Sequence, residues 1–551
     1  MAVDVVDDVV EGLEVLVNGS LVTQRVDAEG EPRFGLLATI RDFAGEQLVG
    51  RGEADAVRRT HLGYYLALAK RCEPLVVGRE QVRWMRVMRA ELENIRGALE
   101  WGIGEAREGE GADARTERVT WATELCHACH EVFWDHGRRN EQSHWAKRSM
   151  AWIDPANVEG AVPGLEPSVV VDPRLLARIR CGYADDWSVE TSLRRMLLEE
   201  VRDSCDALGD HAGAGMAWMG LWGVPTTATG FDVGFRRTCG TEAGVRYRKA
   251  GDARGLIWGL AISVLTAVRV GEIGEGMAAR QEALAIATEH GDVSMIASLT
   301  FVAAFEARRR GDFNEALREI EKSHGLNQSL GRPRTYWNFA GMDETWCLIA
   351  TGDHPAALVT IDGQAREARR RGERRWIDAS SWRRGDLARA QSDLDRARSH
   401  YASVPADWVF NPPLWLAQVE AMAGDVPATV DLLIRAVARY RVRFAEHWAD
   451  DADVAGEVAA CIAEADPVTA LRVGGFASAM RTSGRADHAY PFDQARIDKR
   501  LAVARSLVTT GVAGAAWQAG SDLGAEEAYA EAEAALRVMA DMLGSLPETG
   551  R

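Results

Sequence analysis

The stretch "GDFNEALREI" (residues 311–320) predicts the end of one helix and the start of another. Glycine is favoured just past a helix C-terminus because it takes a left-handed backbone without steric cost, and the Asp312 that follows can cap the next helix. The apolar residues of the stretch fall at i, i+3, i+4 and i+7, on one helical face: Phe313, Ala316, Leu317 and Ile320. The stretch therefore predicts an amphipathic helix that begins directly after a glycine turn.

The same turn recurs at intervals of about 20 residues along the middle of the chain. Its glycines, most of them followed by an acidic residue, are Gly251, Gly271, Gly291, Gly311, Gly331, Gly352 and Gly372. A second pattern follows alternate glycines. The fifth residue after the glycine is small, and the sixth and ninth residues are apolar, except that Arg280 stands at one ninth position. The three sets are Gly276, Met277 and Arg280; Ala316, Leu317 and Ile320; Ala357, Leu358 and Ile361. Two intervals make a helical hairpin of roughly 40 residues, and its small residue marks a close helix crossing.

Repeated hairpins of this kind resemble tetratricopeptide repeats, although they are longer than the usual length of about 34 residues. Because one hairpin cannot bury its apolar face alone, we expect an all-α superhelical array with a concave groove over residues 115–465. Such grooves bind peptides, partner helices or small ligands and rarely carry out chemistry. Three candidate groove residues lie on the predicted first helix of a hairpin: Tyr336, Trp337 and Asn338.

Polar, glycine-containing segments divide the chain. Residues 105–117 predict a linker, and residues 154–173 and 223–230 predict loops. We expect four regions: a partial winged helix at 1–50, a helical connector at 51–105, the repeat array at 115–465 and capping helices at 466–551.

Composition limits the classes of function. The chain has 551 residues, 47% of them hydrophobic and 27% charged, which is enough to bury a sizeable core. Its formal net charge of -17 opposes broad contact with nucleic acid or with an anionic membrane. The uncharged run at residues 255–268 is too short to cross a membrane, and the N-terminus lacks the pattern of a secretory signal. We therefore expect a cytoplasmic protein whose eight cysteines are mostly buried thiols.

The segment "CHACH" (residues 126–130) contains the C-x-x-C-H spacing that attaches c-type haem, and together with His136 it suggests a zinc site as an alternative. Haem attachment requires export, and a structural zinc site normally brings a second ligand pair at similar spacing. Neither sign is found, so we favour ordinary packing, with residues 121–137 as one amphipathic helix.

The motifs of catalysis are missing from the sequence. Without a GK dipeptide there is no phosphate-binding P-loop, and no G-x-S-x-G motif is present. The pair His130 and Glu131 opens a zincin-like motif, but Trp134 occupies the place of the second histidine. The basic run at residues 368–376 is interpreted as solvated helix ends. We predict no catalytic residue, no cofactor and no metal, and a protein that is not an enzyme.

The N-terminal region predicts the second half of a winged-helix domain. The expected elements are a helix at about residues 4–18, a strand at 20–26, a turn at 27–30, a strand at 33–37 and a helix from Thr39.

Residues 10–105 resemble the segment that joins the winged helix to the repeats in bacterial STAND-type signalling ATPases and regulators, many of them actinobacterial. Residues 511–532 look like the closing helices of such proteins, and the likeness is looser over the repeats. The positions that carry the resemblance are Arg33, Phe34, Leu37, Thr39, Ile40, Arg41, Gly52, Glu53, His61, Tyr64, Glu91, Asn94, Arg96, Leu99 and Trp101.

The resemblance implies a switch in which a nucleotide-binding domain, a winged-helix hinge and a repeat sensor act together. This sequence has no ATPase motif, so nucleotide switching is not carried over to it, and the ATPase is expected to be separate or lost. The favoured interpretation is a sensor segment that binds a partner protein or a small inducer in its groove. A free-standing repeat scaffold remains the alternative. Direct DNA binding through the wing is disfavoured because the predicted first helix is acidic, with Asp7, Asp8, Glu11 and Glu14.

Overall fold

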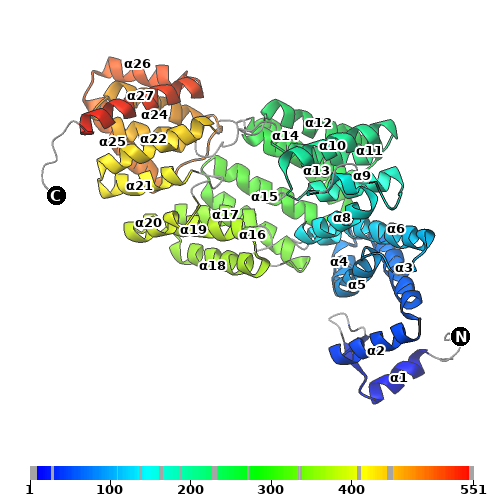
Figure 1. The fold of residues 1–551 in the computed structure, drawn as a ribbon. Coiled ribbons are helices and arrows are strands. Elements are labelled where there is room, and N and C mark those ends of the chain that lie inside the picture. Colours follow the sequence, from blue (N-terminus) through cyan, green and yellow to red (C-terminus); the bar gives the residue numbers. More distant parts are fainter. Residues whose placement is uncertain are drawn as a thin grey trace.

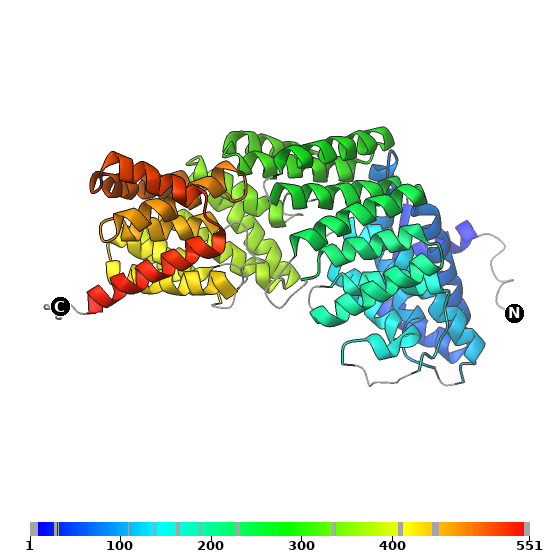
Figure 2. The same ribbon diagram turned by 90° about the horizontal axis from the view of Figure 1, so that it is seen from above.

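Helices built side by side make up nearly all of the molecule, from a small N-terminal lobe through a long array to a C-terminal lobe (Figures 1 and 2). The described part of the chain forms 27 α-helices, one 3-10 helix and one two-stranded antiparallel sheet. The predicted all-α repeat array with a small α+β piece is confirmed. The computed structural model describes residues 9–26, 30, 32–107, 109–135, 139–160, 166–186, 189–225, 232–269, 272–332, 334, 338–405, 411–442 and 451–544.

The N-terminal lobe has the predicted order of helix, strand, strand and helix. Val22 pairs with Leu36 in the sheet, and Val26 pairs with Pro32. Residues 4–8 of the predicted helix and 27–29 of the predicted turn lie outside the described residues. The elements are α1 (Val9–Asn18), β1 (Val22–Val26), β2 (Pro32–Leu36) and α2 (Ala38–Gly50).

Five helices connect this lobe to the array: α3 (Ala54–Cys72), α4 (Gln81–Ala90), α5 (Leu92–Gly102), α6 (Ala112–Ala128) and α7 (His130–Asp135). The predicted linker at 105–117 is wrong in its second half, because α6 already begins at Ala112. The predicted single helix over 121–137 is also wrong. The chain leaves the helix at Cys129, which is fully buried, and restarts as α7. The break directs Glu131 and Trp134 toward the repeat helix that begins at Ala253.

The array begins with α8 (Arg139–Ile153) and the short 3-10 helix η1 (Pro155–Asn157) and continues as alternating inner and outer helices. Its first helices are α9 (Pro173–Ala184), α10 (Thr191–Ala207), α11 (His211–Trp222), α12 (Val233–Ala250), α13 (Ala253–Arg269) and α14 (Ile273–His290). Its later helices are α15 (Val293–Arg309), α16 (Phe313–Ser329), α17 (Asn338–Ala350), α18 (His354–Arg371), α19 (Arg374–Ala390), α20 (Leu394–Ala402), α21 (Pro412–Ala423) and α22 (Val426–Val442).

The predicted glycine turns are confirmed. Six of the seven glycines have φ between +68° and +82°, and Gly271 lies outside the described residues. The aspartates that follow them cap the next helix as expected; Asp312, for example, accepts a hydrogen bond from the backbone N–H of Glu315 at 2.8 Å. The sequence therefore encodes each helix end locally.

The C-terminal lobe contains α23 (Asp451–Ile462), α24 (Pro467–Thr482), α25 (Pro491–Ser506), α26 (Thr510–Ser521) and α27 (Ala525–Gly544). Its helices share a buried core with the end of the array, which runs from Met342 to Leu536. A second large core runs from Leu62 to Cys239 and joins the connector to the first repeats. The predicted boundaries at residues 105 and 465 fall inside these cores, and they stay predictions as domain boundaries.

The small residues of the repeat lie at close helix crossings, as expected. Ala316 and Ala357 are fully buried, and Ile320 packs beside Ala304 of α15. The predicted apolar stripe is wrong at its sixth position in two of three repeats, because Met277 and Leu358 are exposed. Where neighbouring helices cross, the fifth and ninth residues after the glycine face the contact between them. The sixth residue lies at the edge of that contact.

Substitution of Ala316 by Leu is expected to destabilise the array by about 1–3 kcal/mol, because the added atoms have no room between α15, α16 and α17. Substitution of Asn314 by Leu is the matched control, since Asn314 lies on the same helix and is exposed. Urea unfolding followed by circular dichroism measures both variants. Equal stabilities would show that the crossing is not close at Ala316.

Candidate partner-binding site: the covered inner face of the array

The inner face of the array is formed by alternate helices, among them α13, α15, α17 and α19, which contact one another in sequence. All residues of α15 are buried or half-buried. The outer helix α16, by contrast, exposes polar positions along its length. An inner helix of a repeat array faces a groove, so this burial means that other segments of the chain cover the groove here.

One cover comes from the connector and lies over the N-terminal end of α15 and the turn that follows α16. Gln81 of α4 is fully buried, and its Oε1 accepts a hydrogen bond from the backbone N–H of Ser294 at 2.9 Å. Arg89 donates to the carbonyl oxygens of Leu330 and Gly331 at 2.9 Å and 3.1 Å. These backbone groups belong to a helix start and a turn, where no helical partner is available. The connector therefore supplies hydrogen-bond partners that the array needs.

A buried ion-pair group joins the connector to the same helix ends. Arg254, in the first turn of α13, pairs with both Glu131 of α7 and Asp292 at the start of α15. Burial by itself would raise the pKa of Glu131, but the nearby Arg254 outweighs it and the pKa is lowered. Trp134 also packs edge-on against Trp258, with ring centroids 5.8 Å apart. One buried guanidinium thus holds carboxylates from the connector and from the start of α15 together.

The wing contacts the connector through a second charged group, which we call the wing latch: Arg33, Tyr65, Glu91 and Asn94. Arg33 of β2 donates to one carboxylate oxygen of Glu91. The other oxygen accepts from the Tyr65 hydroxyl at 2.9 Å and from the Asn94 amide at 2.8 Å. Burial would raise the pKa of Glu91, but these hydrogen bonds together lower it. The latch holds β2 on the turn between α4 and α5.

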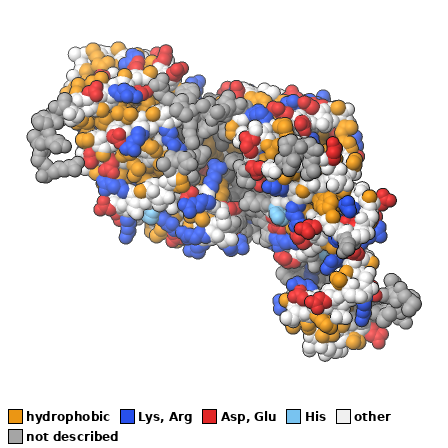
Figure 3. Space-filling model, viewed as in Figure 1, with side chains coloured by type: hydrophobic (Ala, Val, Ile, Leu, Met, Phe, Trp, Pro, Cys, Tyr) orange, Lys and Arg blue, Asp and Glu red, His pale blue; other side chains and the backbone are white. Residues whose placement is uncertain are grey.

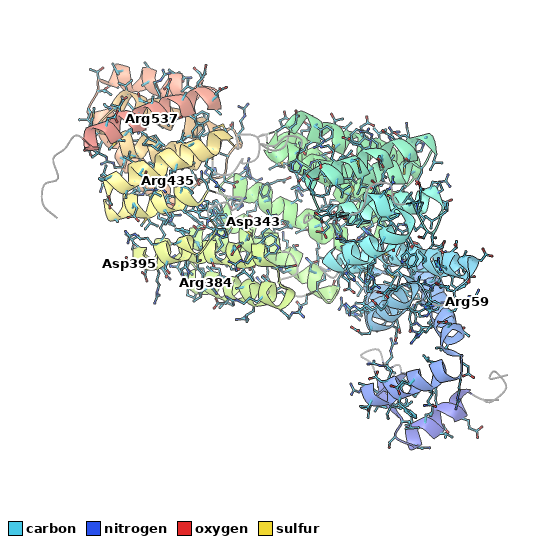
Figure 4. All side chains as sticks on the ribbon, viewed as in Figure 1. Arg59, Asp343, Arg384, Asp395, Arg435 and Arg537 are labelled. Atoms are coloured by element: carbon cyan, nitrogen blue, oxygen red, sulfur yellow. The ribbon has the colours of Figure 1, made fainter. Side chains whose placement is uncertain are left out.

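The other cover lies at the C-terminal ends of the inner helices. It is formed by residues 484–493, which run from the end of α24 into the first turn of α25 and which we call the inner strap. Asp487 pairs with Arg308 at 3.0 Å and with Arg309 at 3.1 Å. Arg308 also pairs with Asp343 of α17, which is labelled in the middle of the molecule in Figure 4. The inner helix α15 is therefore covered at both ends by the chain itself.

The candidate groove residues are only partly placed. Tyr336 and Trp337 lie outside the described residues, and Asn338 is the first residue of the inner helix α17. Sequence reasoning missed the inner strap and its arginine partners. It did single out Arg33, Glu91 and Asn94 as positions of family resemblance, and the structure brings these three together.

The predicted packing role of "CHACH" agrees with the surroundings of its residues. Cys126 and Cys129 are fully buried in the core of the connector and the first repeats. Burial lowers the pKa of His127 to about 3 and raises that of Cys126 to about 12. His136 lies outside the described residues. Across the described ranges, the structure contains no group of three or more His, Cys, Asp or Glu side chains placed to hold a metal ion. None of the helices described is long and apolar enough to span a membrane.

Comparison with known proteins identifies the N-terminal region. Residues 2–49 match the family described as winged helix-turn-helix domain. The chain is also 38% identical over 93 residues to candidate HTH-type transcriptional regulators of Mycobacterium bovis (strain ATCC BAA-935 / AF2122/97) and Mycobacterium tuberculosis (strain ATCC 25618 / H37Rv). The match covers 17% of this chain and 10% of each regulator, so the chain spans about a tenth of the length of these relatives. An N-terminal winged helix-turn-helix domain homologous to bacterial regulators is thus established, and the predicted resemblance is confirmed.

Solved structures with a helical-repeat likeness are more distant. A Rap protein complexed with competence and sporulation factor is 11% identical, with a TM-score of 0.41, and the match covers 70% of this chain and 92% of that one. A STAND protein with a tetratricopeptide repeat sensor from Pyrococcus horikoshii is 13% identical, with a TM-score of 0.33, and the match covers 71% of this chain and 58% of that one.

Substitution of Glu91 by Ala is expected to destabilise the protein by about 1–3 kcal/mol, because the Tyr65 hydroxyl is left without its buried acceptor. Hydrogen exchange of the amides in β2 should become faster, since Arg33 loses its carboxylate. Substitution of Glu93 by Ala is the control on the same helix, where the side chain is 84% exposed. Unchanged exchange in β2 of the Glu91 variant would contradict the latch.

The wing latch also predicts a dependence on pH. Because the pKa of Glu91 is lowered from its ordinary value of 4.5, its stabilising contribution is complete above about pH 4.5 and is lost as the pH falls through the folded-state pKa. We expect the wild type to have a higher Tm than a Glu91→Gln variant at pH 7, and the difference to shrink as the pH falls below 4.5. Thermal unfolding at a series of pH values measures it. A constant difference would assign the effect of the substitution to packing instead of charge.

Proposed function

We propose that this chain is the sensor segment of a bacterial transcriptional regulator, in which a partner bound to the repeat array alters the position of the winged-helix region. The partner is a protein or a small inducer in the groove. In this proposal the segment binds its partner and does not catalyse a reaction, and an ATPase, where the regulator has one, is separate from this segment.

The observation that carries the proposal is the double contact of the connector. On one side, Glu91 holds the wing through Arg33. On the other side, Gln81 and Arg89 hold the turns that begin α15 and follow α16. Coupling between two sites requires an element whose position both sites affect, and α4 meets that description. Movement of the inner helices would displace α4 and with it the wing.

The exposed surface of the N-terminal lobe favours the binding of a further partner to this lobe. Large apolar side chains lie open to solvent on α1 and α2: Val15 is 65% exposed, and Phe43 and Val49 are each 62% exposed. Hydrophobic surface is visible on this lobe in Figure 3. Large exposed apolar side chains gathered on one small lobe are typical of an interaction site in a folded protein. In the proposed function this surface packs against the remainder of the regulator.

A free-standing scaffold is the second candidate, and a genetic experiment separates the two. Deletion of the coding sequence in the source organism should change the level of a defined set of transcripts, measured by RNA sequencing. An Arg89→Ala variant should reproduce the deletion, because it removes the two hydrogen bonds from Arg89 to the turn after α16 while leaving the wing latch intact. An Arg83→Ala variant is the matched control, since Arg83 lies on the same helix with a side chain that is 74% exposed.

The outcomes are distinct. Unchanged transcription after deletion would refute the regulator and favour the scaffold. A deletion effect that Arg89→Ala does not reproduce would retain the regulator but refute coupling through α4. Binding of promoter DNA by the isolated chain in a gel-shift assay would instead support direct recognition of DNA by the wing. The net charge of -17 disfavours DNA binding.

A further inference from the structure

The inner strap, residues 484–493, binds the array as a peptide ligand would. Residues 487–490 have no regular secondary structure and lie across the C-terminal ends of the inner helices. At the start of the strap, Arg309 donates to the carbonyl oxygen of Gly484 at 2.7 Å. The His488 ring covers Gly311, where an added Cβ would lie 3.4 Å from it. The strap thus follows the helix ends from α15 toward α19.

An aromatic side chain anchors the centre of the strap. The Tyr490 ring stacks on Trp346 of α17, with centroids 5.0 Å apart and an interplanar angle of 28°. Its hydroxyl donates to Asp386 of α19 at 3.0 Å. The guanidinium groups of Arg308 and Arg383 lie over the same Trp346 ring, at 4.8 Å and 4.9 Å from its centroid. Trp346 is therefore the floor of an aromatic subsite bordered by two cations.

The strap also balances the charge of the array. Four nearly fully buried guanidinium groups lie along α15 and α19, and among the described residues the array contributes Asp343 and Asp386 to their ion pairs. The strap supplies two more carboxylates. Asp487 meets the guanidinium groups of α15, and both oxygens of Asp493 lie 2.6 Å from Arg389. The four cations are Arg308, Arg309, Arg383 and Arg389.

Ion pairs of this kind hold the strap in register without adding much net stability. The free energy needed to remove the two charges from water is nearly as large as the free energy that their pairing releases. Leaving one partner buried and unpaired, by contrast, is strongly unfavourable. The arginines thus require anions, but the anions need not belong to residues 484–493. A second peptide with the same groups can replace the strap at little net cost.

We propose that the array binds acidic peptides that carry an aromatic residue between two carboxylates, and that the inner strap is the built-in competitor for this site. The recognised pattern is that of the strap, in which Asp487, Tyr490 and Asp493 are spaced three residues apart. This inference rests on the proposed function insofar as it takes the array to be the part that binds a partner. It names the chemistry of that partner as a peptide of another protein.

The test uses the full-length chain and a fluorescein-labelled peptide with the strap sequence, GRADHAYPFD. An Asp487→Asn variant has a weakened strap, so we expect it to bind the peptide at least ten-fold more tightly than the wild type in fluorescence anisotropy. A peptide with both aspartates changed to asparagine should not bind. A double variant, Arg308→Gln with Arg309→Gln, should lose binding. Arg310→Gln is the matched control, because Arg310 is adjacent, 38% exposed and paired with Glu315.

A second measurement needs no variant. Arg485 lies in the strap and is exposed, so trypsin can reach it once the strap leaves the array. For this measurement the peptide begins at Ala486 (ADHAYPFD) and so has no site for trypsin. Saturating peptide should increase the rate of cleavage after Arg485 in the wild type several-fold, and the asparagine version of the peptide should not. An unchanged rate, or equal binding of both peptides, would overturn the proposal and make the strap a fixed part of the core. Because both measurements are made in vitro, they can fail while transcription still responds to deletion of the coding sequence.

Discussion

Two adjacent guanidinium groups, those of Arg308 and Arg309, are buried at the end of α15, and the C-terminal half of the molecule is arranged to accommodate them. A buried cation requires a carboxylate with good geometry. Asp487 serves both arginines at once, and burial of its carboxyl, which would raise its pKa, is outweighed by their charges, which lower it. The segment that carries Asp487 must therefore lie on the inner face. That requirement brings α24 and α25, which flank the strap, against helices that precede them by more than a hundred residues.

The N-terminal end of the same helix shows the same solution with different residues. Arg254 is buried between Glu131 and Asp292, and Asp292 also accepts a hydrogen bond from the N–H of Met295. One aspartate of the repeat pattern thus caps α15 and pairs with a guanidinium of the neighbouring inner helix, α13. The repeat signature and the contact with the connector share this residue. Burial of charge, and not apolar area alone, fixes which segments cover the inner helices.

The sequence was informative where the signal is local. A glycine with positive φ and an aspartate cap involve residues a few positions apart, so the turns at Gly291 and Gly311 could be predicted without knowledge of the fold. The winged-helix strands were predicted for the same reason. The cover of the inner face could not be predicted, because Arg308 and Arg309 stand in a basic run that is indistinguishable from a solvated helix end. The break at Cys129 was not predicted, because the contacts that α7 makes with α13 join residues more than a hundred positions apart in the sequence.

The inner helix α15 links the two covers mechanically. Its first turn is held by Gln81, and its last turn is held by Asp487. A helix of 17 residues is about 25 Å long and stiff on that scale, so its two ends cannot move independently. Departure of the strap would remove the anion at one end and allow the helix to shift against α4 at the other. If the array binds a partner as proposed, linkage makes the effect reciprocal. A winged-helix region held in one position would then change the affinity of the array for the partner by the same factor as the partner changes the preferred position of the wing.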